Sequence, residues 1–382
     1  MMARLGDYIE QIRGVSYKPE DVCTSQDEDA VAILRANNIQ DDGLIFDDLV
    51  YVKKSKVADK QYIQKGDIVV CASSGSKSLV GKAAMANESM LISFGAFCKI
   101  VRPKKLIPSY IGHYFQSPKY RNTISEMAGG ANINNIRNEH IDELYIAIVS
   151  EDEQEKIITE LNATSNLISL RKQQLSKLDE LVKSRFIEMF GDPVASKNKR
   201  KLSEIGRVFT GNTPSMKEPS YYESNDIPFI KPSDLNESGV TYIDGVEAYV
   251  SEKARPVARI IPPQAVLVTC IGTIGKIGIT ARESCCNQQI NFIMPNDGIN
   301  SVYLAHCLTF FKSTLQNIAN APVVPIINKT QFSELEIPVF EVDKQQRFAA
   351  FVEQTDKSKF EIQKSLDQLE TLKKSLMQKY FG

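Results

Sequence analysis

The chain has 382 residues, enough for two domains of ordinary size, with 42% hydrophobic and 24% charged residues as in a typical globular protein. Its 46 basic and 47 acidic residues nearly cancel to a net charge of −1, which argues against strong binding of nucleic acid through overall charge but allows a local basic face. No apolar run reaches about 18 residues, and the start of the chain lacks the apolar core of a signal peptide, so we expect a cytoplasmic protein with no membrane partner.

The first part of the chain, residues 1–150, is expected to be rich in short strands. Residues 32–39 (AILRANNI) read as an apolar strand followed by a polar loop. Residues 66–76 (GDIVVCASSGS) read as a β-branched strand that enters a tight Gly/Ser turn. We therefore predict that these residues form one strand-rich domain.

A long amphipathic helix is predicted next, from about residue 152 to Phe190, within a helical region at residues 151–191. Apolar residues such as Leu178 and Leu181 recur three and four positions apart, with polar residues on the other faces. The helix ends on Phe190 followed by a glycine, which is a typical stop signal. The apolar stripe is narrow and close to the seam of a heptad repeat.

The rest of the chain repeats this order, with a strand-rich part at residues 192–341 and a helical region at residues 342–382. Residues 366–382 (LDQLETLKKSLMQKYFG) match residues 175–191 (LSKLDELVKSRFIEMFG) at seven of seventeen positions, including the final Phe-Gly. The second helix is therefore predicted from about residue 343 to Phe381. An internal repeat of this length indicates a duplicated unit.

The strand-rich parts also resemble each other. Gly14 matches Gly211 at an offset of 197, and residues 66–76 match residues 263–273 (PQAVLVTCIGT) at the same offset. The offset later falls as small insertions and deletions accumulate, which belong in surface loops.

A helix of this length cannot bury its apolar seam on itself. We therefore expect the two helices to pack against each other as an antiparallel pair, with one strand-rich domain at each end. The alternative is that each helix packs separately against other partners.

Patterns typical of an active site are missing. The loop at residues 75–83 (GSKSLVGKA) has five residues between its glycines and Ala after the Lys, so it does not fit a phosphate-binding loop. His113 and His306 occupy matching positions among aromatic and apolar residues, and we interpret them as structural. Seven cysteines without a C-x-x-C pair argue against a zinc site. We expect no catalytic residue, no metal and no cofactor in this chain.

Several segments together resemble the specificity subunit of type I restriction–modification systems, and the resemblance extends over the whole chain. The segments that carry it are LDELVKSRFIEMFGDP (178–193), LSEIGRVFTGNTPS (202–215), IPFIKPSDL (227–235) and NQQINFIMP (287–295). The resemblance implies an α+β fold with pseudo-two-fold symmetry, in which two strand-rich α/β target recognition domains are joined by two long antiparallel helices that form an intramolecular coiled coil.

The resemblance also implies function and partners. A subunit of this family is non-catalytic and reads the two halves of a bipartite site in double-stranded DNA. It recruits two methyltransferase subunits and the restriction (translocase) subunits, which use S-adenosylmethionine, ATP and Mg. The first domain departs from the second because Gly-Val-Ser-Tyr at residues 14–17 stands where Gly-Asn-Thr-Pro stands at residues 211–214.

Polar and basic residues in loops are the candidates for contact with DNA, because they can reach base edges and phosphates. In the first domain they are Arg35, Asn37, Asn38, Ser73, Ser74, Ser76, Lys77, Asn132, Asn134, Asn135 and Arg137. In the second domain they are Thr213, Ser215, Lys231, Ser233, Thr273, Lys276, Gln288, Asn328 and Lys329.

The helices suggest a spacer between the two readers. Roughly 30 paired residues span about 45 Å, compared with about 34–36 Å for one turn of B-DNA. Our hypothesis is that helix length sets the spacing of the two half-sites, so one heptad inserted near Ser169 should shift it. A scaffold with paired protein-binding domains and an enzyme with an unrecognised site remain alternatives, and sequencing of DNA enriched by the protein separates the three.

Overall fold

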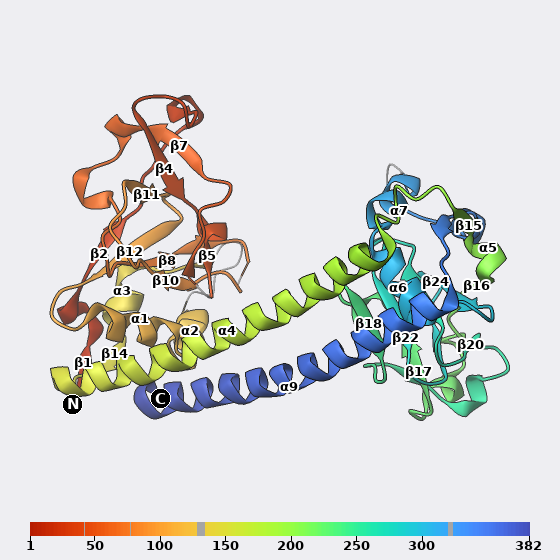
Figure 1. The fold of residues 1–382 in the computed structure, drawn as a ribbon. Coiled ribbons are helices and arrows are strands. Elements are labelled where there is room, and N and C mark those ends of the chain that lie inside the picture. Colours follow the sequence, from red (N-terminus) through yellow and green to blue (C-terminus); the bar gives the residue numbers. More distant parts are fainter. Residues whose placement is uncertain (42, 77, 128–133, 320–323) are drawn as a thin grey trace. The chain divides into compact units, whose positions relative to one another are not determined.

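The computed structural model describes residues 1–41, 43–76, 78–127, 134–319 and 324–382. The chain divides into two units: Met1–Arg171 with Lys364–Gly382 form the first, and Lys172–Gln363 form the second. Each unit therefore contains part of both long helices, so the structural units cut across the repeat seen in the sequence (Figure 1).

The first unit contains two four-stranded sheets. One has the order β10-β8-β12-β2 and is antiparallel throughout; the other has the order β11-β4-β7-β3 and includes one parallel pair, β11 with β4. The strands of these sheets are β2 (Ile9–Arg13), β3 (Val22–Cys23), β4 (Ala30–Leu34), β7 (Val50–Lys53), β8 (Ile68–Cys71), β10 (Ala83–Met85), β11 (Ile92–Phe94) and β12 (Cys98–Pro103). Two-stranded pairs are formed by β1 (Met2–Arg4) with β14 (Tyr145–Ala147), β5 (Ile39–Gln40) with β6 (Gly43–Leu44), and β9 (Ser73–Ser74) with β13 (Asn134–Asn135).

Helices cover one side of the antiparallel sheet in the first unit. Apolar residues of β8 and β12 pack with those of α1 and α2 and of the two long helices in one buried cluster. Figure 1 shows α1 and α2 between this sheet and the start of the long helix α4 (Glu151–Phe190). The helices are α1 (Pro108–Gln116), α2 (Pro118–Met127) and α3 (Asn138–Asp142).

The second unit repeats this plan. A five-stranded sheet has the order β16-β24-β21-β22-β18, and a four-stranded sheet has the order β19-β17-β23-β20. The strands are β15 (Lys199–Lys201), β16 (Gly206–Thr210), β17 (Ile227–Ile230), β18 (Val240–Ile243), β19 (Tyr249–Val250), β20 (Ile260–Ile261), β21 (Val266–Thr269), β22 (Ile277–Thr280), β23 (Ser284–Cys286), β24 (Ile290–Pro295) and β25 (Glu336–Pro338), of which β15 pairs with β25. The helices are α5 (Leu202–Ile205), α6 (Ser301–Thr309), α7 (Lys312–Ile318) and α8 (Lys329–Ser333).

The two long helices are α4 (Glu151–Phe190) and α9 (Val342–Phe381), each within a residue or two of its predicted bounds. In the first unit the Tyr380 hydroxyl donates a hydrogen bond to Glu160 Oε2 at 2.5 Å. In the second unit Lys359 Nζ lies 2.6 Å from Asp179 Oδ1. In both units a late residue of one helix therefore meets an early residue of the other, which confirms the antiparallel pairing.

Two leucines predicted to lie on the buried apolar stripes of the long helices are exposed. Leu181 is 48% exposed and Leu372, its repeat partner, is 47% exposed. Val182, the next residue along α4, is buried instead. Because a helix turns through about 100° per residue, a leucine three positions after Leu178 leaves the seam while a residue four positions after it stays there.

The Phe that ends each long helix is a packing residue. The Phe190 ring lies 4.9 Å from the Tyr303 ring in the second unit. The Phe381 ring lies 5.3 Å from the Tyr110 ring in the first unit. Each repeat therefore supplies the terminal Phe of its helix to the unit that contains the other repeat's strands.

A buried glutamine in the first turn of each long helix forms a hydrogen bond to the segment before α1 or α6. The Gln154 side-chain oxygen accepts a hydrogen bond from Ile107 N at 3.0 Å, and the Gln345 oxygen accepts one from Asn300 N at 2.9 Å. Both glutamines are at least 95% buried. These bonds hold the segment before α1 or α6 against the first turn of the helix.

Equivalent backbone hydrogen bonds correct the alignment of the two repeats at one strand. Ala72 N donates to Phe97 O at 2.8 Å, as Cys270 N donates to Gln289 O at 2.7 Å. Ala72 thus corresponds to Cys270, one residue away from the sequence alignment of residues 66–76. A shift of one residue is hard to detect there because both strands are rich in β-branched residues and are buried on both faces.

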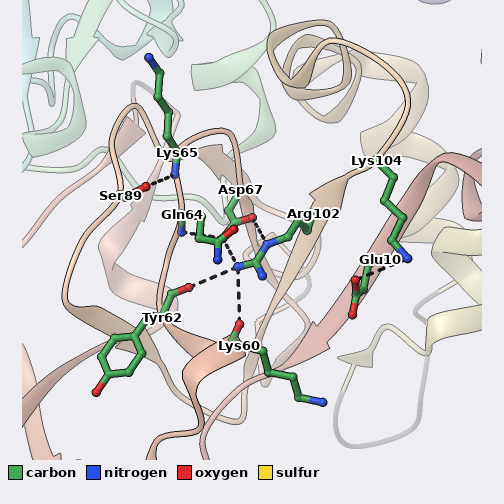
Figure 2. Close-up of polar contacts among 9 residues, drawn as sticks. All are labelled: Glu10, Lys60, Tyr62, Gln64, Lys65, Asp67, Ser89, Arg102 and Lys104. Carbon is green, nitrogen blue, oxygen red and sulfur yellow. Dashed lines mark hydrogen bonds and ion pairs between the residues drawn. The ribbon is translucent and has the colours of Figure 1, made fainter.

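A buried ion pair lies at the end of the first unit's antiparallel sheet where β8 begins and β12 ends (Figure 2). Arg102 Nε and Nη2 donate to the two carboxylate oxygens of Asp67, each at 2.8 Å. The Asp67 side chain is 1% exposed, and its hydrogen bond raises the pKa of Arg102. In the second unit Val266 pairs with Ile293, and the next two residues along these strands, Ala265 and Met294, are apolar.

Among the described residues, no helix is both long enough and apolar enough to cross a membrane.

Candidate nucleic-acid interface

Four segments of the first unit meet at one end of its antiparallel sheet, where β2 and β8 end and β12 begins. We call this surface the first strand-end face, and it comprises residues 14–17, 73–76, 94–97 and 134–137. Backbone hydrogen bonds join its segments from Val15 N to Phe94 O (2.8 Å), from Ser73 N to Phe97 O (3.0 Å) and from Ile136 N to Ala72 O (2.8 Å).

The second unit builds the same arrangement where β16 and β21 end and β24 begins. The second strand-end face comprises residues 211–215, 271–275, 287–289 and 326–329. Its segments are joined through the strand residues just before them, from Asn212 N to Cys286 O (2.9 Å), from Cys270 N to Gln289 O (2.7 Å) and from Ile327 N to Cys270 O (2.8 Å). The two faces thus share a backbone framework and differ in the side chains that they carry.

A glycine is required at the first segment of each face. A Cβ atom on Gly14 would lie 2.1 Å from Gly95 O, and one on Gly211 would lie 2.3 Å from Asn287 O. These separations are far below van der Waals contact, so no other residue fits without moving the backbone. The glycine match found in the sequence therefore marks the close approach of two face segments.

Buried polar side chains support the fourth segment of each face. In the first unit Lys99 Nζ donates to Gln11 Oε1 at 3.0 Å and to Asn138 Oδ1 at 2.8 Å. Burial lowers the pKa of Lys99 to about 8. In the second unit Asn291, at the equivalent position, accepts a hydrogen bond from the Thr210 hydroxyl at 2.6 Å. Its side-chain nitrogen also donates to Ile327 O at 3.4 Å.

Most of the residues predicted for the first domain lie on or beside the first strand-end face. Ser73 and Ser74 are half-buried, whereas Ser76, Asn135 and Arg137 are exposed. Asn134 contributes its backbone to β13, opposite Ser74. Lys77 and Asn132 lie outside the described residues.

The other three predicted residues of the first domain follow β4. Arg35 comes directly after Leu34, whose carbonyl accepts a hydrogen bond from Gly95 N at 2.9 Å. The Arg35 guanidinium pairs with Asp48 at 2.7 Å, and Asn37 is exposed. Asn38 is fully buried: its oxygen accepts a hydrogen bond from Arg35 N at 2.8 Å and its nitrogen donates to Asp47 O at 2.7 Å.

The residues predicted for the second domain are mostly exposed. They are Thr213, Ser215, Lys231, Ser233, Thr273, Gln288, Asn328 and Lys329. The Thr213 hydroxyl donates to Gln288 Oε1 at 2.6 Å, so two segments of the face share a side-chain contact. Asn328 caps α8 through a hydrogen bond from Gln331 N at 2.9 Å.

Lys276 differs from this group because it is only 9% exposed. Its ammonium lies 2.7 Å from Glu237 Oε1. Asn38 and Lys276 therefore do not reach the surface, and each stabilises a loop behind the face instead. A polar residue after a strand has the same sequence signature whether it caps a loop or points to solvent.

Two residues on or beside these faces were not predicted from the sequence. Arg259 lies beside the second strand-end face, where its guanidinium donates to Thr210 O and its backbone N donates to Asn212 Oδ1 at 2.7 Å. Phe97 lies on the first strand-end face and is 69% exposed. No motif marks either residue, because an isolated arginine and the exposure of a single aromatic depend on contacts distant in sequence.

Within the part of the chain that the structure describes, no three His, Cys, Asp or Glu side chains lie close enough together to hold a metal ion. Burial raises the pKa of the Cys98 and Cys270 thiols to about 12. These thiols are therefore protonated and inert near neutral pH.

Two similar units, each with a set of loops at the end of a sheet and both connected through paired helices, define a protein with two related loop surfaces. The family model for the type I restriction modification DNA specificity domain matches residues 2–180 and 195–373. The chain therefore belongs to this family, and it contains the domain twice.

Curated relatives are specificity subunits of type I restriction enzymes. The StySPI subunit of Salmonella potsdam is 43% identical over 45% of this chain and 37% of its own length. The EcoKI subunit of Escherichia coli (strain K12) is 39% identical over 52% of this chain and 42% of its own length. The matched part thus spans about two fifths of each relative.

A solved structure shows the same fold. The S subunit of a type I restriction-modification system from M. genitalium aligns with a TM-score of 0.56 and 15% identity. The alignment covers 100% of this chain and 96% of that one.

Proposed function

We propose that this chain is the DNA sequence-specificity subunit of a type I restriction–modification complex and that each strand-end face reads one half of a bipartite site. The observation that carries the proposal is the shared backbone framework of the two faces, which presents different side chains on the same four segments. A duplicated framework with changed side chains is suited to reading two different short sequences in the same way.

In this proposal the chain is not itself an enzyme. Methyltransferase subunits supply the S-adenosylmethionine chemistry, and restriction subunits supply translocation and cleavage with ATP and Mg. The complex acts on double-stranded DNA in the cytoplasm. We divide the chain into recognition domains at 1–150 and 192–341 and helical regions at 151–191 and 342–382.

Exposed leucines on the long helices support docking of methyltransferase subunits. Leu181 in the second unit and Leu372 in the first are repeat partners with nearly equal exposure, 48% and 47%. Large apolar side chains exposed at the same place in two copies fit two copies of one partner. Near-zero net charge fits a subunit whose partners provide most phosphate contacts.

Methylation profiling tests the proposed function. Genomic DNA from cells with and without this gene is compared, and the expected result is a bipartite methylated motif that depends on the gene. A gene-dependent motif in one uninterrupted block, or no motif when the partner subunits are present, contradicts the proposal.

Combined replacement of Asn134, Asn135 and Arg137 by Ala tests the first strand-end face. We expect loss of sequence-selective methylation at unchanged thermal stability. Lys53→Ala with Lys54→Ala is the matched control, because these exposed residues lie where β7 ends, beside the start of β4 and away from the face. Unaltered methylation by the triple variant contradicts the assignment.

The long helices lead to a second test. Both connections between the units run inside continuous helices, α4 and α9. We propose that helix length sets the half-site spacing, so one heptad inserted after Ser169 together with one inserted in the facing part of α9 should lengthen the spacer. A variant that keeps methylating the original spacing contradicts this role.

A further inference from the structure

Phe97 combines an exposed ring with a firmly held backbone. Its side chain is 69% exposed. The residue lies in a turn closed by a hydrogen bond from Cys98 N to Gly95 O at 2.8 Å. Its carbonyl accepts hydrogen bonds from two further amides, Ala72 N at 2.8 Å and Ser73 N at 3.0 Å. Exposure of a large apolar side chain to water is unfavourable. Three backbone hydrogen bonds nevertheless hold the turn that keeps this ring exposed.

A two-stranded ribbon adjoins this turn. Ser73–Ser74 pairs in antiparallel register with Asn134–Asn135. The major groove of B-DNA admits a ribbon of this kind, and its base edges include one apolar group, the C5-methyl of thymine. The side chains of Ser73, Ser74 and Asn135 in the ribbon can exchange hydrogen bonds with base edges, but they have little apolar surface for that methyl group.

We infer that Phe97 is a specificity-determining residue whose ring contacts the C5-methyl of a thymine in the half-site read by the first unit. This inference rests on the proposed function. It adds an apolar reader to a face whose other candidates are polar.

The second unit has different chemistry at the same turn. There Ile290 N donates to Asn287 O at 3.2 Å, and the two residues between them are Gln288 and Gln289. Glutamine suits the donor and acceptor pair of adenine in the major groove. The same turn thus presents an apolar side chain in one unit and amide side chains in the other, so we expect the two units to select different bases.

The test uses the subunit assembled with its methyltransferase partner and the motif found by methylation profiling. Each thymine of the first half-site is replaced singly by deoxyuridine, which removes only the C5-methyl group. The initial methylation rate at low DNA concentration is measured for wild type and for Phe97→Ala. We expect one replacement to slow the wild type about four-fold, the effect of losing burial of about one methyl group. Phe97→Ala should be slow on thymine DNA and indifferent to that replacement.

Two controls make the result specific. Leu91→Ala removes another highly exposed apolar side chain, 86% exposed, just before β11 begins, whereas Phe97 lies beyond the end of that strand. It should behave as wild type. Phe97→Leu keeps an apolar contact and should retain part of the sensitivity to deoxyuridine. Unchanged melting temperatures show that the variants are folded.

Other outcomes overturn the inference. They are a first half-site without thymine, no deoxyuridine position whose effect depends on Phe97, or an equal slowing of every duplex by Phe97→Ala. In each of these cases a bipartite motif still upholds the proposed function. Failure of the proposed function itself is recognised separately, by the absence of any gene-dependent bipartite motif.

Discussion

The Thr213 hydroxyl donates a hydrogen bond to the side-chain oxygen of Gln288 at 2.6 Å. Both residues are exposed, and they come from the segments that follow β16 and β23. Thr213 thereby restrains the Gln288 amide and leaves its NH2 group free to donate. A reader held in one orientation loses less conformational entropy on binding than a free one.

Thr213→Val should therefore weaken selection of the base read by Gln288. Valine has nearly the same shape as threonine but lacks the hydroxyl donor. We expect discrimination between bases at one position of the second half-site to fall about 5- to 10-fold, the effect of losing roughly one hydrogen bond. Competition between methylation of matched and single-mismatch duplexes measures this ratio. Thr213→Ser keeps the donor and should retain wild-type discrimination; equal discrimination by the Val and Ser variants would contradict the positioning role.

The Asp67–Arg102 ion pair predicts a strong single-variant effect. Asp67→Ala leaves the guanidinium partly buried without its carboxylate, which costs about 3–5 kcal/mol of unfolding free energy. The double variant Asp67→Ala, Arg102→Met recreates the Ala265 and Met294 pair of the second unit, where these positions pack in an apolar cluster. We expect it to recover most of the loss, because an apolar pair of similar size often replaces a buried ion pair without cost.

Urea denaturation of the wild type, the two single variants and the double variant measures the coupling free energy between positions 67 and 102. Ala265→Asp in the second unit is the matched control, because it buries a carboxylate opposite Met294 and should destabilise. Additive losses in the double variant would show that the ion pair is not replaceable in this sheet.

The long helices and the repeat were predictable because their signals are local: apolar residues recur at helical spacing, and Gly14 and Gly211 recur at a fixed offset. Sequence patterns did not distinguish the exposed residues of the faces from buried loop residues such as Asn38. Asn37 and Asn38 are adjacent polar residues, and only the structure shows that the Asn38 side chain is buried and bonded to Arg35 N and Asp47 O. The contributions of Arg259 and Phe97 likewise depend on pairing between distant strands, which a sequence alone does not show.

The Phe that ends each long helix should stabilise the unit that contains the strands of the other sequence repeat. Phe381→Ala should destabilise the first unit and Phe190→Ala the second, each by about 3–5 kcal/mol, as expected for a deleted core ring. Amide hydrogen exchange separates the two effects: protection should fall in α1 for Phe381→Ala and in α6 for Phe190→Ala. Loss of protection in the unit that contains the same sequence repeat instead would contradict the packing with Tyr110 and Tyr303.

Two buried histidines predict a loss of stability at mildly acidic pH. Burial lowers the pKa of His113 to about 4 and that of His306 to about 3, with Lys373 and Lys359 adding to the effect. Below about pH 6.5 the unfolded chain binds a proton at each histidine while the folded chain does not. The free energy of unfolding should therefore fall as the pH decreases from about 6.5 to about 4, by up to about 1.4 kcal/mol per pH unit for each histidine.

The double variant His113→Gln, His306→Leu tests this contribution. Gln can keep a hydrogen bond to Asn162, whose oxygen lies 2.8 Å from His113 Nε2. Leu suits the other site, where His306 Nε2 has no hydrogen-bond partner among the residues that the structure describes. Urea denaturation at pH 8, 6.5 and 5 gives the slope for both proteins, and carboxylates contribute equally to each. The variant should lose clearly less stability between pH 6.5 and 5 than the wild type, whereas parallel curves would show that the histidines do not set the acid sensitivity.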